Sequence, residues 1–444
     1  MVDHRTIVAL ASGALPSAIA LIRISGPDVP SVAAATLGKE PLPVRKAALR
    51  TFRDANGAAV DQVVATYYQA PASYTGEDML EFGFHGGVAV VERALGALID
   101  LPGLGLAEPG AFTRRAVLAG KLDLLEAEAV ADLVEAETEA QRAQALSQLG
   151  GGVSQIYDMW RAALVEALSA IEVSVDFPDE GDVGSAPERA AAAPIERLSR
   201  DLGTALASAR AGLQVRSGTQ IAIIGPPNAG KSSFLNALAG RDVAIVTDRP
   251  GTTRDVLETR LNLNGHLVRV CDTAGLRETG DEVEAEGVRR AQALAAECDV
   301  LVGIYDVGDG PGRGPDFFGL EPDLVLANKI DLLPGTANVS CETFAVSAQT
   351  GEGLDAVLAE LSKRIEHTAP SQGAAVITRQ RHLEAVSAAK SALERAGSGL
   401  SRGAPPELVA EDVRQAIRAL GSAVGRVDVE DVLGSIFSSF CIGK

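Results

Sequence analysis

The segment TQIAIIGPPNAGKSSFLNALAG, residues 219–240, combines a short apolar run, a turn rich in glycine and proline, and a run with helical spacing. The turn GPPNAGKS (225–232) matches the pattern G-x-x-x-x-G-K-[ST] at every fixed position. Glycines let backbone N–H groups face phosphate oxygens, Lys231 supplies positive charge, and the hydroxyl of Ser232 suits Mg²⁺. A strand, this turn and a helix in succession predict a P-loop nucleotide-binding domain.

Three further motifs follow the P-loop in the order that a GTPase requires. CDTAG (271–275) comes after the strand-like run HLVRV, so Asp272 can reach the Mg²⁺ shell. NKID (328–331) follows the apolar run DLVLA, and its final aspartate can accept the N1 and 2-amino protons of guanine, which adenine lacks. SAQTGEG (347–353) suits the loop that backs the guanine. The expected nucleotide is therefore GTP.

A switch loop must supply a threonine to Mg²⁺, and PGTTRD (250–255) lies between the P-loop and CDTAG. The residues expected to contact GTP come from these five motifs and their neighbours: Asn228, Ala229, Gly230, Lys231, Ser232, Ser233, Thr247, Asp248, Arg249, Pro250, Gly251, Thr252, Thr253, Asp272, Thr273, Ala274, Gly275, Asn328, Lys329, Asp331, Ser347, Ala348 and Gln349.

The position after the D-x-x-G glycine is Leu276, where Ras-like GTPases place a glutamine that orients water. One of the acids that follow could take this role, or all could form a solvated face: Glu278, Asp281, Glu282, Glu284 and Glu286. Asn228, in the middle of the P-loop, has two interpretations. Its oxygen, together with loop carbonyls, could bind a monovalent cation beside the phosphates, or the residue could only shape the turn.

Composition limits the classes of protein that remain. The chain has 444 residues, 46% of them hydrophobic and 22% charged, as in soluble globular proteins of roughly three domains. A net charge of −19 disfavours a large face for RNA, so any RNA role needs a basic partner or a local patch such as 113–115 or 378–382. We expect a cytoplasmic protein, because no secretory signal, membrane span or CxxC pair is present.

The pattern along the chain predicts a multidomain α/β protein. Residues 1–120 combine strand-like runs (TIVAL, SAIALIRI, DQVVATYYQA, MLEFGF) with the helical run VAVVERALGALID, which predicts an α+β domain. Residues 121–215 and 372–444 are rich in helical patterns, including KLDLLEAEAVADLVEAETEAQRAQALSQL. The segment 216–371 alternates strands and helices. The simplest account is a Ras-like GTPase domain inserted into an all-α helical domain.

The chain ends in SSFCIGK (438–444), with a cysteine four residues from the end. This is no prenylation signal, because Gly443 stands where an aliphatic residue belongs and the last residue is Lys444. Three interpretations of Cys441 stay open: a packed thiol, a participant in chemistry, and a redox sensor.

Over essentially its whole length the chain resembles the MnmE (TrmE) family of tRNA-modification GTPases. The resemblance is carried by IALIRISGP, YTGEDMLEFGFHGG, EPGAFTRRAVLAGKLDLLEAEAVADL, GPPNAGKSSFLNAL, TDRPGTTRD, DTAGLRETGDEVEAEG, NKID and the terminal FCIGK. It implies an N-terminal folate-binding-like domain that mediates dimerisation, and a GTPase domain that K⁺ activates by promoting dimerisation of the GTPase domains. It also implies a flavin-dependent partner (MnmG, also called GidA) in a heterotetramer.

The resemblance assigns roles to individual residues. Ser232 and Thr253 would bind Mg²⁺, and the catalytic glutamate would be Glu284, twelve positions after Asp272. K⁺ would be bound by Asn228, Thr247, Arg249 and Thr252, and tetrahydrofolate by Arg23, Glu81, Lys121 and Lys444. A carboxylate suits the paired donors of a pterin, and cations suit a glutamate tail.

The expected function is a GTP-hydrolysing enzyme that builds an aminomethyl or carboxymethylaminomethyl group at C5 of the wobble uridine of certain tRNAs. A 5-formyl- or methylene-tetrahydrofolate would supply the one-carbon unit, and the partner would hold most of the tRNA. Two alternatives stay open: a GTPase switch in ribosome assembly, which usually carries a basic RNA-binding module, and a folate enzyme with a vestigial GTPase domain, which the intact GKS, DTAG and NKID motifs oppose.

Overall fold

A computed structural model describes residues 5–176, 186–241, 243–245, 258–272, 292–309, 317–333, 343–368, 375–425, 429–438 and 440–443. The chain forms two compact units. The first unit consists of residues 1–131, 149–162 and 417–444, and the second of residues 132–148 and 163–416. The division into four domains drawn from the sequence stays a prediction.

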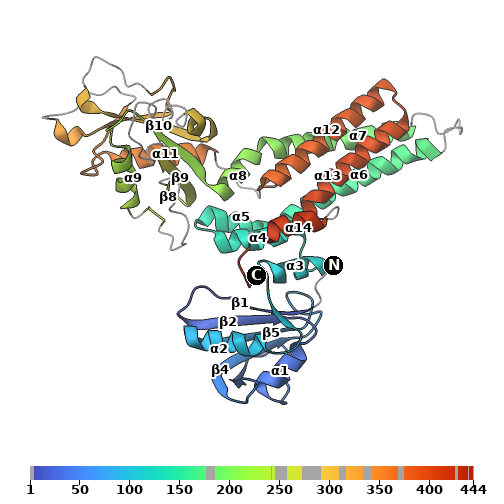
Figure 1. The fold of residues 1–444 in the computed structure, drawn as a ribbon. Coiled ribbons are helices and arrows are strands. Elements are labelled where there is room, and N and C mark those ends of the chain that lie inside the picture. Colours follow the sequence, from blue (N-terminus) through green and yellow to red (C-terminus); the bar gives the residue numbers. More distant parts are fainter. Residues whose placement is uncertain are drawn as a thin grey trace, which may run out of the picture. The chain divides into compact units, whose positions relative to one another are not determined.

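A six-stranded sheet forms the centre of the first unit, in the order β3-β4-β5-β2-β1-β6 (Figure 1). All neighbouring strands are antiparallel except β1 and β6, which are parallel. The strands are β1 (Thr6–Leu10), β2 (Ser17–Ser25), β3 (Ala48–Arg53), β4 (Ala59–Tyr68), β5 (Met79–Gly86) and β6 (Leu104–Leu106). The strands and the helix predicted for this region are confirmed.

Helices α1 (Val29–Leu37) and α2 (Val88–Ile99) cover one face of this sheet. Side chains alternate between the two faces of a strand, so Ile22, Phe82 and Phe84 are buried under the helices. The face opposite them carries exposed apolar side chains, among them Ile19 and Leu49. The first unit therefore has an α+β fold in which the opposite face is covered beside Ile7 and Ala9 by Phe112 and is exposed at Ile19 and Leu49.

The same unit contains α3 (Ala111–Leu118), the first residues of α4 (Leu124–Glu135) and α14 (Val429–Ser438). Leu124 of α4 packs with Leu433 and Phe437 of α14 and with Phe440 beyond it. Gly110 precedes α3 with a φ of 67°, and a Cβ there would lie 2.8 Å from the Phe437 ring. The C-terminal segment is thus held in the first unit by a packed helix.

The second unit contains another six-stranded sheet, in the order β12-β11-β10-β7-β9-β8. Its strands are β7 (Thr219–Ile224), β8 (Glu258–Leu263), β9 (His266–Asp272), β10 (Val300–Asp306), β11 (Leu324–Asn328) and β12 (Thr343–Ala345). All pairs are parallel except the β8–β9 hairpin. Helices α9 (Lys231–Ala239) and α11 (Leu354–Thr368) bury their apolar residues on one face of the sheet. This is the predicted P-loop α/β fold.

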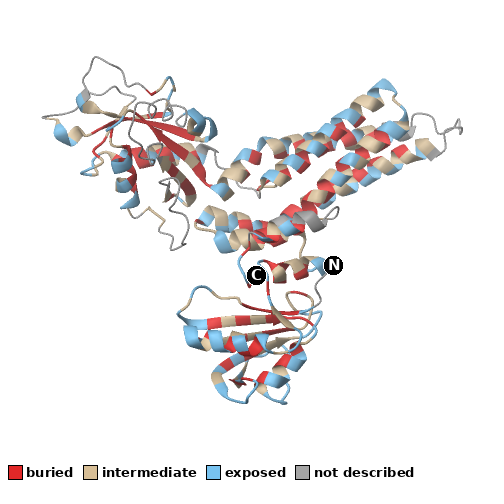
Figure 2. Cartoon of the chain, viewed as in Figure 1, coloured by how far each residue is buried: buried red, intermediate tan, exposed pale blue. Residues whose placement is uncertain are grey.

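Helices make up the rest of the second unit, and Figure 2 shows buried residues running along them as well as along the strands. They are α5 (Glu139–Leu149), α7 (Ala186–Ala207), α8 (Ala209–Ser217), α12 (Gln380–Arg402) and parts of α6 (Gly152–Asp176) and α13 (Pro406–Val424), because residues 149–162 and 417–424 belong to the first unit. Among the helices that the structure describes, none is long and apolar enough to cross a membrane.

The helical run expected from residue 121 is broken between α4 and α5. Thr138 and Gln141 form a capping box: the N–H of Gln141 donates to Thr138 Oγ1 (3.4 Å), and the N–H of Thr138 donates to Gln141 Oε1 (3.1 Å). A new helix therefore begins here, although every residue around the break is compatible with a helix.

Candidate functional site

The P-loop lies between β7 and α9 and is shaped by its glycines. Gly225 has a φ of 152°, and a Cβ on it would lie 2.0 Å from the carbonyl oxygen of Ile304. Gly230 has a φ of 92°, and its Cβ would lie 2.2 Å from Nδ2 of Asn328. Another residue at Gly225 would push against the backbone of β10, and one at Gly230 would displace the side chain of Asn328, both with an unfavourable φ. The sequence pattern thus reflects close backbone approach at both ends of the turn.

Lys231 begins α9 and is buried, with 8% of its surface exposed. Its Nζ donates to the carbonyl oxygens of Gly225 (2.8 Å) and Pro226 (2.9 Å), so the charge is held at the mouth of the loop. Asn228 is exposed at the turn with a φ of 62°. The geometry fits a phosphate group bound at the N-terminus of a helix.

Asn328, at the end of β11, joins the P-loop to the expected guanine loop. Its Nδ2 donates to the carbonyl oxygen of Ala229 (2.9 Å), and its Oδ1 accepts from the N–H of Ala348 (3.0 Å). Ser347 donates through Oγ to Oδ1 of Asp331 (2.6 Å), which orients that carboxylate. The structure therefore brings three of the five predicted GTPase motifs together at one edge of the sheet.

Two residues of this site were missed by sequence reasoning. Asp306, at the end of β10, forms an ion pair with Lys329 (2.6 Å) of NKID. Burial opposes ionisation of Asp306, but hydrogen bonds from Lys329 and the Gly308 N–H outweigh it and lower its pKa below the ordinary value. Arg241 donates to the carbonyl oxygen of Gly351 (3.1 Å) and pairs with Asp355, which holds the guanine loop from outside. Asp306 could have been found from the sequence, because it is a charged residue at the end of an apolar strand pattern.

The DTAG motif begins at the end of β9, where Asp272 is the register partner of Ile223 in the P-loop strand. Its backbone is therefore beside the P-loop, although its side chain lies outside the described part of the chain. The remaining switch predictions also lie outside the described residues: Thr247, Asp248, Arg249, Pro250, Gly251, Thr252, Thr253, Thr273, Ala274, Gly275 and Glu284.

In the first unit, the sheet face opposite the helices brings two of the predicted folate residues together. Arg23 of β2 and Glu81 of β5 are register partners, and their side chains form an ion pair at 2.8 Å. Tyr68 of β4 donates through its hydroxyl to the other oxygen of Glu81 (3.3 Å). The guanidinium of Arg23 also lies over the rings of Tyr74 (5.6 Å) and Phe112 (5.7 Å).

The other two residues predicted to bind folate, Lys121 and Lys444, also belong to the first unit. Nη1 of Arg23 donates to the carbonyl oxygen of Gly443 (3.5 Å), the neighbour of Lys444, which itself lies outside the described residues. Gly443 has a φ of 95°, and a Cβ there would meet the carbonyl oxygen of Leu10 at 2.4 Å. The side chain of Lys121 lies beside Gly76. The C-terminal segment thus contacts the strands that carry the ion pair.

Two family models and many curated relatives match the chain. A model described as the MnmE helical domain matches residues 124–441, and one described as the N-terminus of the GTP-binding protein TrmE matches residues 6–121. The tRNA modification GTPase MnmE of Hyphomonas neptunium is 50% identical over 444 residues and all of both chains. That of Caulobacter vibrioides is 49% identical over 99% of each chain.

The chain belongs to the MnmE family. It is a GTP-hydrolysing enzyme of tRNA modification. Among solved structures, Aquifex aeolicus Era bound to GDP and aluminium fluoride is 27% identical, covering 39% of this chain and 66% of that chain with a TM-score of 0.27. The fold assignment rests on the strand order and the family models instead.

The structure narrows the interpretation of Cys441. Its side chain is exposed, and only its backbone carbonyl is engaged, by the N–H of Gly110 (3.5 Å). The packed thiol was therefore the wrong interpretation for this MnmE-family chain. A chemical role and a redox role both stay open.

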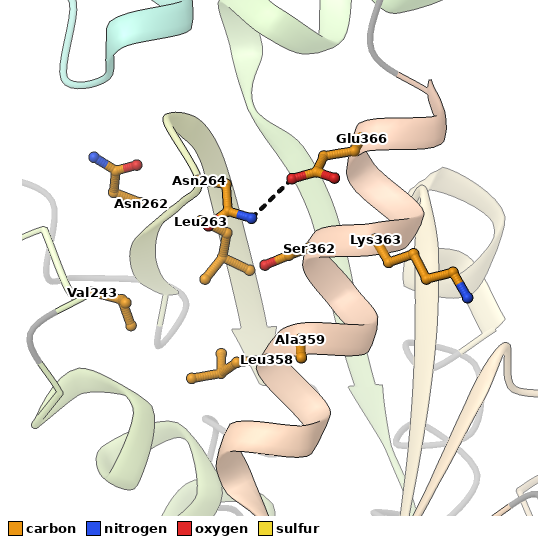
Figure 3. Close-up of a pocket in the computed structure, with 9 residues that line it drawn as sticks. All are labelled: Val243, Asn262, Leu263, Asn264, Leu358, Ala359, Ser362, Lys363 and Glu366. Atoms are coloured by element: carbon orange, nitrogen blue, oxygen red, sulfur yellow. Dashed lines mark hydrogen bonds between the residues drawn. The ribbon is translucent and has the colours of Figure 1, made fainter.

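A cavity of about 390 Å³ lies elsewhere in the GTPase fold, between the β8–β9 hairpin and α11 (Figure 3). Figure 3 shows Asn264 at the tip of the hairpin bonded to Glu366 of α11 (2.8 Å), with Leu263 and Leu358 below them. Among the described residues, none of the GTPase motifs contributes to the lining of this cavity. It is therefore separate from the nucleotide site.

Proposed function

We propose that this chain, as a homodimer joined to a flavin-dependent MnmG-type partner in a heterotetramer, forms an aminomethyl or carboxymethylaminomethyl group at C5 of the wobble uridine of certain tRNAs. Hydrolysis of GTP, with Mg²⁺ and K⁺, would be coupled to this reaction in the cytoplasm. The observation that carries the proposal is the ion pair of Arg23 and Glu81, which lies against the C-terminal segment in a chain of this family.

The residues around that ion pair suit a reduced folate. Such a cofactor would supply the one-carbon unit, as 5-formyl- or methylene-tetrahydrofolate. Glu81 offers two carboxylate oxygens to the paired donors of a pterin, and Tyr68 fixes one of them. The partly exposed ring of Tyr74 provides a flat apolar surface, and the buried ring of Phe112 lies against Arg23. Lys121, like Lys444, provides positive charge for the glutamate tail.

The GTPase site suits Mg²⁺ and K⁺. Ser232 is the first-turn hydroxyl of α9 and would bind Mg²⁺ together with Thr253. Asn228 is exposed on the P-loop, where its amide oxygen would bind K⁺ with backbone oxygens of Thr247, Arg249 and Thr252. A cation there supplies the positive charge that an arginine finger gives other GTPases. Glu284 would orient the attacking water.

The hydrolysis part of the proposal is tested by GTP turnover in KCl and in NaCl, for the parent chain and for Glu284→Ala. We expect turnover at least about tenfold faster in KCl, and a loss of about a hundredfold or more in the variant, as for a residue that orients the nucleophile. Glu286→Ala is the matched control and should keep its turnover. Equal rates in the two salts would remove the K⁺ site, and an active Glu284→Ala would remove the glutamate assignment.

The folate part is tested by equilibrium binding of 5-formyltetrahydrofolate. Glu81→Gln keeps the shape of the side chain but removes the charge that pairs with Arg23 and faces the pterin donors. We expect affinity to fall about tenfold or more. Asp61→Asn, on neighbouring β4 and bonded to His85, is the control. Unchanged affinity of Glu81→Gln would exclude this site for folate.

The tRNA part requires cells in which the chain is deleted. Mass spectrometry of their tRNA should show loss of the C5 group on wobble uridines, and the parent chain should restore it. Because the net charge is −19, we expect purified chain alone to bind tRNA weakly and the partner to hold most of it. Normal wobble uridines in the deleted cells would overturn the proposed reaction.

A further inference from the structure

The GTPase fold is joined to the helices of the second unit by two links of the chain. The incoming link is residues 209–218, which comprises α8 and leads into β7, and the outgoing link is residues 375–379, which leads into α12. The two links touch at Gly212, where a Cβ would lie 2.2 Å from the carbonyl oxygen of Ile377 and 2.8 Å from the Cβ of Ala375. They therefore form one junction.

Asp132, on α4, bonds both links through a single oxygen. Its Oδ1 accepts from Nε of Arg216 (2.9 Å) on the incoming link and from Nη2 of Arg379 (2.6 Å) on the outgoing link. Only 13% of the Asp132 side chain is exposed, so these charge-assisted bonds are shielded from solvent. One carboxylate thus pairs with two arginines that are far apart in the sequence.

Helix α5 adds three glutamines on one face, at spacings of three and four residues. Nε2 of Gln141 donates to the carbonyl oxygen of Arg216 (3.0 Å), and Nε2 of Gln144 donates to that of Gly212 (3.1 Å). Gln148 accepts from Oγ1 of Thr378 (3.1 Å). We call Asp132, Gln141, Gln144 and Gln148 the junction clamp.

The segment that carries the clamp also contacts the β8–β9 hairpin. Arg260 of β8 forms an ion pair with Glu137 (2.8 Å), and the N–H of Ala140 donates to the carbonyl oxygen of Gly265 (3.0 Å). In the sequence, β8 directly follows the segment with the predicted switch residues Thr252 and Thr253. A cavity of about 290 Å³ lies among these charged side chains. The clamp segment therefore contacts both links and the strand next to the switch.

We propose that Asp132 is a positioning residue of the tRNA-modification reaction: through the junction clamp it holds the GTPase fold in the orientation in which GTP hydrolysis drives modification. Asp132 is absent from the nucleotide site, so hydrolysis itself does not depend on it. Without the carboxylate, two adjacent guanidinium groups lose their shared partner and repel each other, and both links loosen together.

The test compares the Asp132→Asn variant with the parent chain in three measurements. Amide hydrogen exchange should rise about tenfold in both the incoming and the outgoing link, because their local opening becomes easier. In cells, the modified nucleoside that the parent chain restores should fall about threefold to thirtyfold, the range for coupling residues. GTP turnover of the purified variant should stay within about twofold of the parent, since its nucleotide site is intact.

Matched controls remove an ion pair that lies within α5 alone. Glu139→Gln and Arg142→Gln each remove one partner of the ion pair that these two residues form on α5. Both should leave exchange and modification unchanged. Asp132→Asn with unchanged exchange, with faster exchange in one link only, or with turnover and modification lost in parallel would each overturn the proposal.

A second pair of variants keeps the test valid if Asp132→Asn fails to fold. Arg216→Gln and Arg379→Gln each remove one of the two donors and leave the carboxylate paired with the other. Each single variant should lower modification less than the double variant that combines Arg216→Gln and Arg379→Gln. Adding Asp132→Asn to this double variant should change modification no further. Fully additive effects of all three changes would show that the carboxylate is not shared.

Discussion

Asn328 shows how one side chain can set the geometry of a whole nucleotide site. It is 2% exposed and bonds one loop through its amide nitrogen and another through its amide oxygen. Ala229 belongs to the phosphate-binding loop, and Ala348 belongs to the guanine-binding loop. Because neither loop has a direct backbone bond to the other among the described contacts, the distance between phosphate and base sites depends on this residue.

Asn328→Ala should therefore weaken GTP binding by loosening the two loops that Asn328 joins. The change leaves the carbonyl oxygen of Ala229 and the N–H of Ala348 without their partner, at a cost of about 1–3 kcal/mol, which corresponds to about a tenfold or greater rise in Kd for GTP. Titration with a fluorescent GTP analogue measures it. Asn236→Ala, an exposed asparagine on α9, should keep the parent affinity. An unchanged Kd for Asn328→Ala would contradict the role.

Asp306→Asn should lower stability in a pH-dependent way. Burial opposes its charge, but Lys329 and the Gly308 N–H lower the pKa of Asp306 below 3.8, so its contribution is complete above that pH and is lost as pH falls through the lowered pKa. At pH 7 the variant should be less stable by about 0.5–1 kcal/mol. Urea denaturation in steps from pH 7 to pH 3 should show the difference vanish only at the acid end. A difference that grows in acid would have the wrong sign.

At the scale of elements, α8 can approach the outgoing link closely because residue 212 is a glycine. Gly212→Ala places a methyl group 2.2 Å from the carbonyl oxygen of Ile377, a backbone atom that cannot turn aside. Although alanine favours a helix, the clash should cost about 1–3 kcal/mol. Thermal unfolding measures the cost. Gly203→Ala in α7, where the nearest atom lies 3.5 Å away at the end of Lys390, should be neutral or stabilising.

The sequence predicts the elements whose patterns are local. The strand, turn and helix of the P-loop and the strands predicted within residues 6–84 are confirmed at close to their predicted ends. The break at Thr138 was missed because a capping box competes with a continuous helix, and only tertiary bonds to Gln141 decide between them. Strand β3 was missed because its charged residues, Arg50 and Arg53, interrupt its apolar pattern.

The candidate sites were predictable to the extent that motifs define them. Lys231, Asn328 and Asp331 follow from patterns with a fixed spacing. Asp306 and Asp132 have no such pattern, because their partners come from other strands and helices and meet only in the folded chain. Arg23 and Glu81 were assigned through a family resemblance, and the register of β2 with β5 explains why they meet.

At the scale of the whole molecule, each unit combines a sheet with a distinct chemical site. The first unit has the pair of Arg23 and Glu81, and the second has the GTPase motifs. Strand register places an apolar patch on the same sheet face as that pair: Ile19 lies two positions from Leu21 and four from Arg23, and Gly83 of β5 lies opposite Leu21. A second copy of the chain covering the patch would lie beside the pair.

Ile19→Asp should therefore convert a dimer into a monomer. Ile19 is 67% exposed, Leu49 66% and Val64 47%, and Gly83 between them leaves the surface flat enough for another sheet. Burying a carboxylate in such an interface without a partner costs several kcal/mol, so Kd for the dimer should rise at least about a hundredfold. Sedimentation velocity over a range of concentrations measures this. Leu408→Asp, an equally exposed apolar residue of α13, should remain dimeric. If Ile19→Asp sediments as the parent does, the homodimer uses another surface.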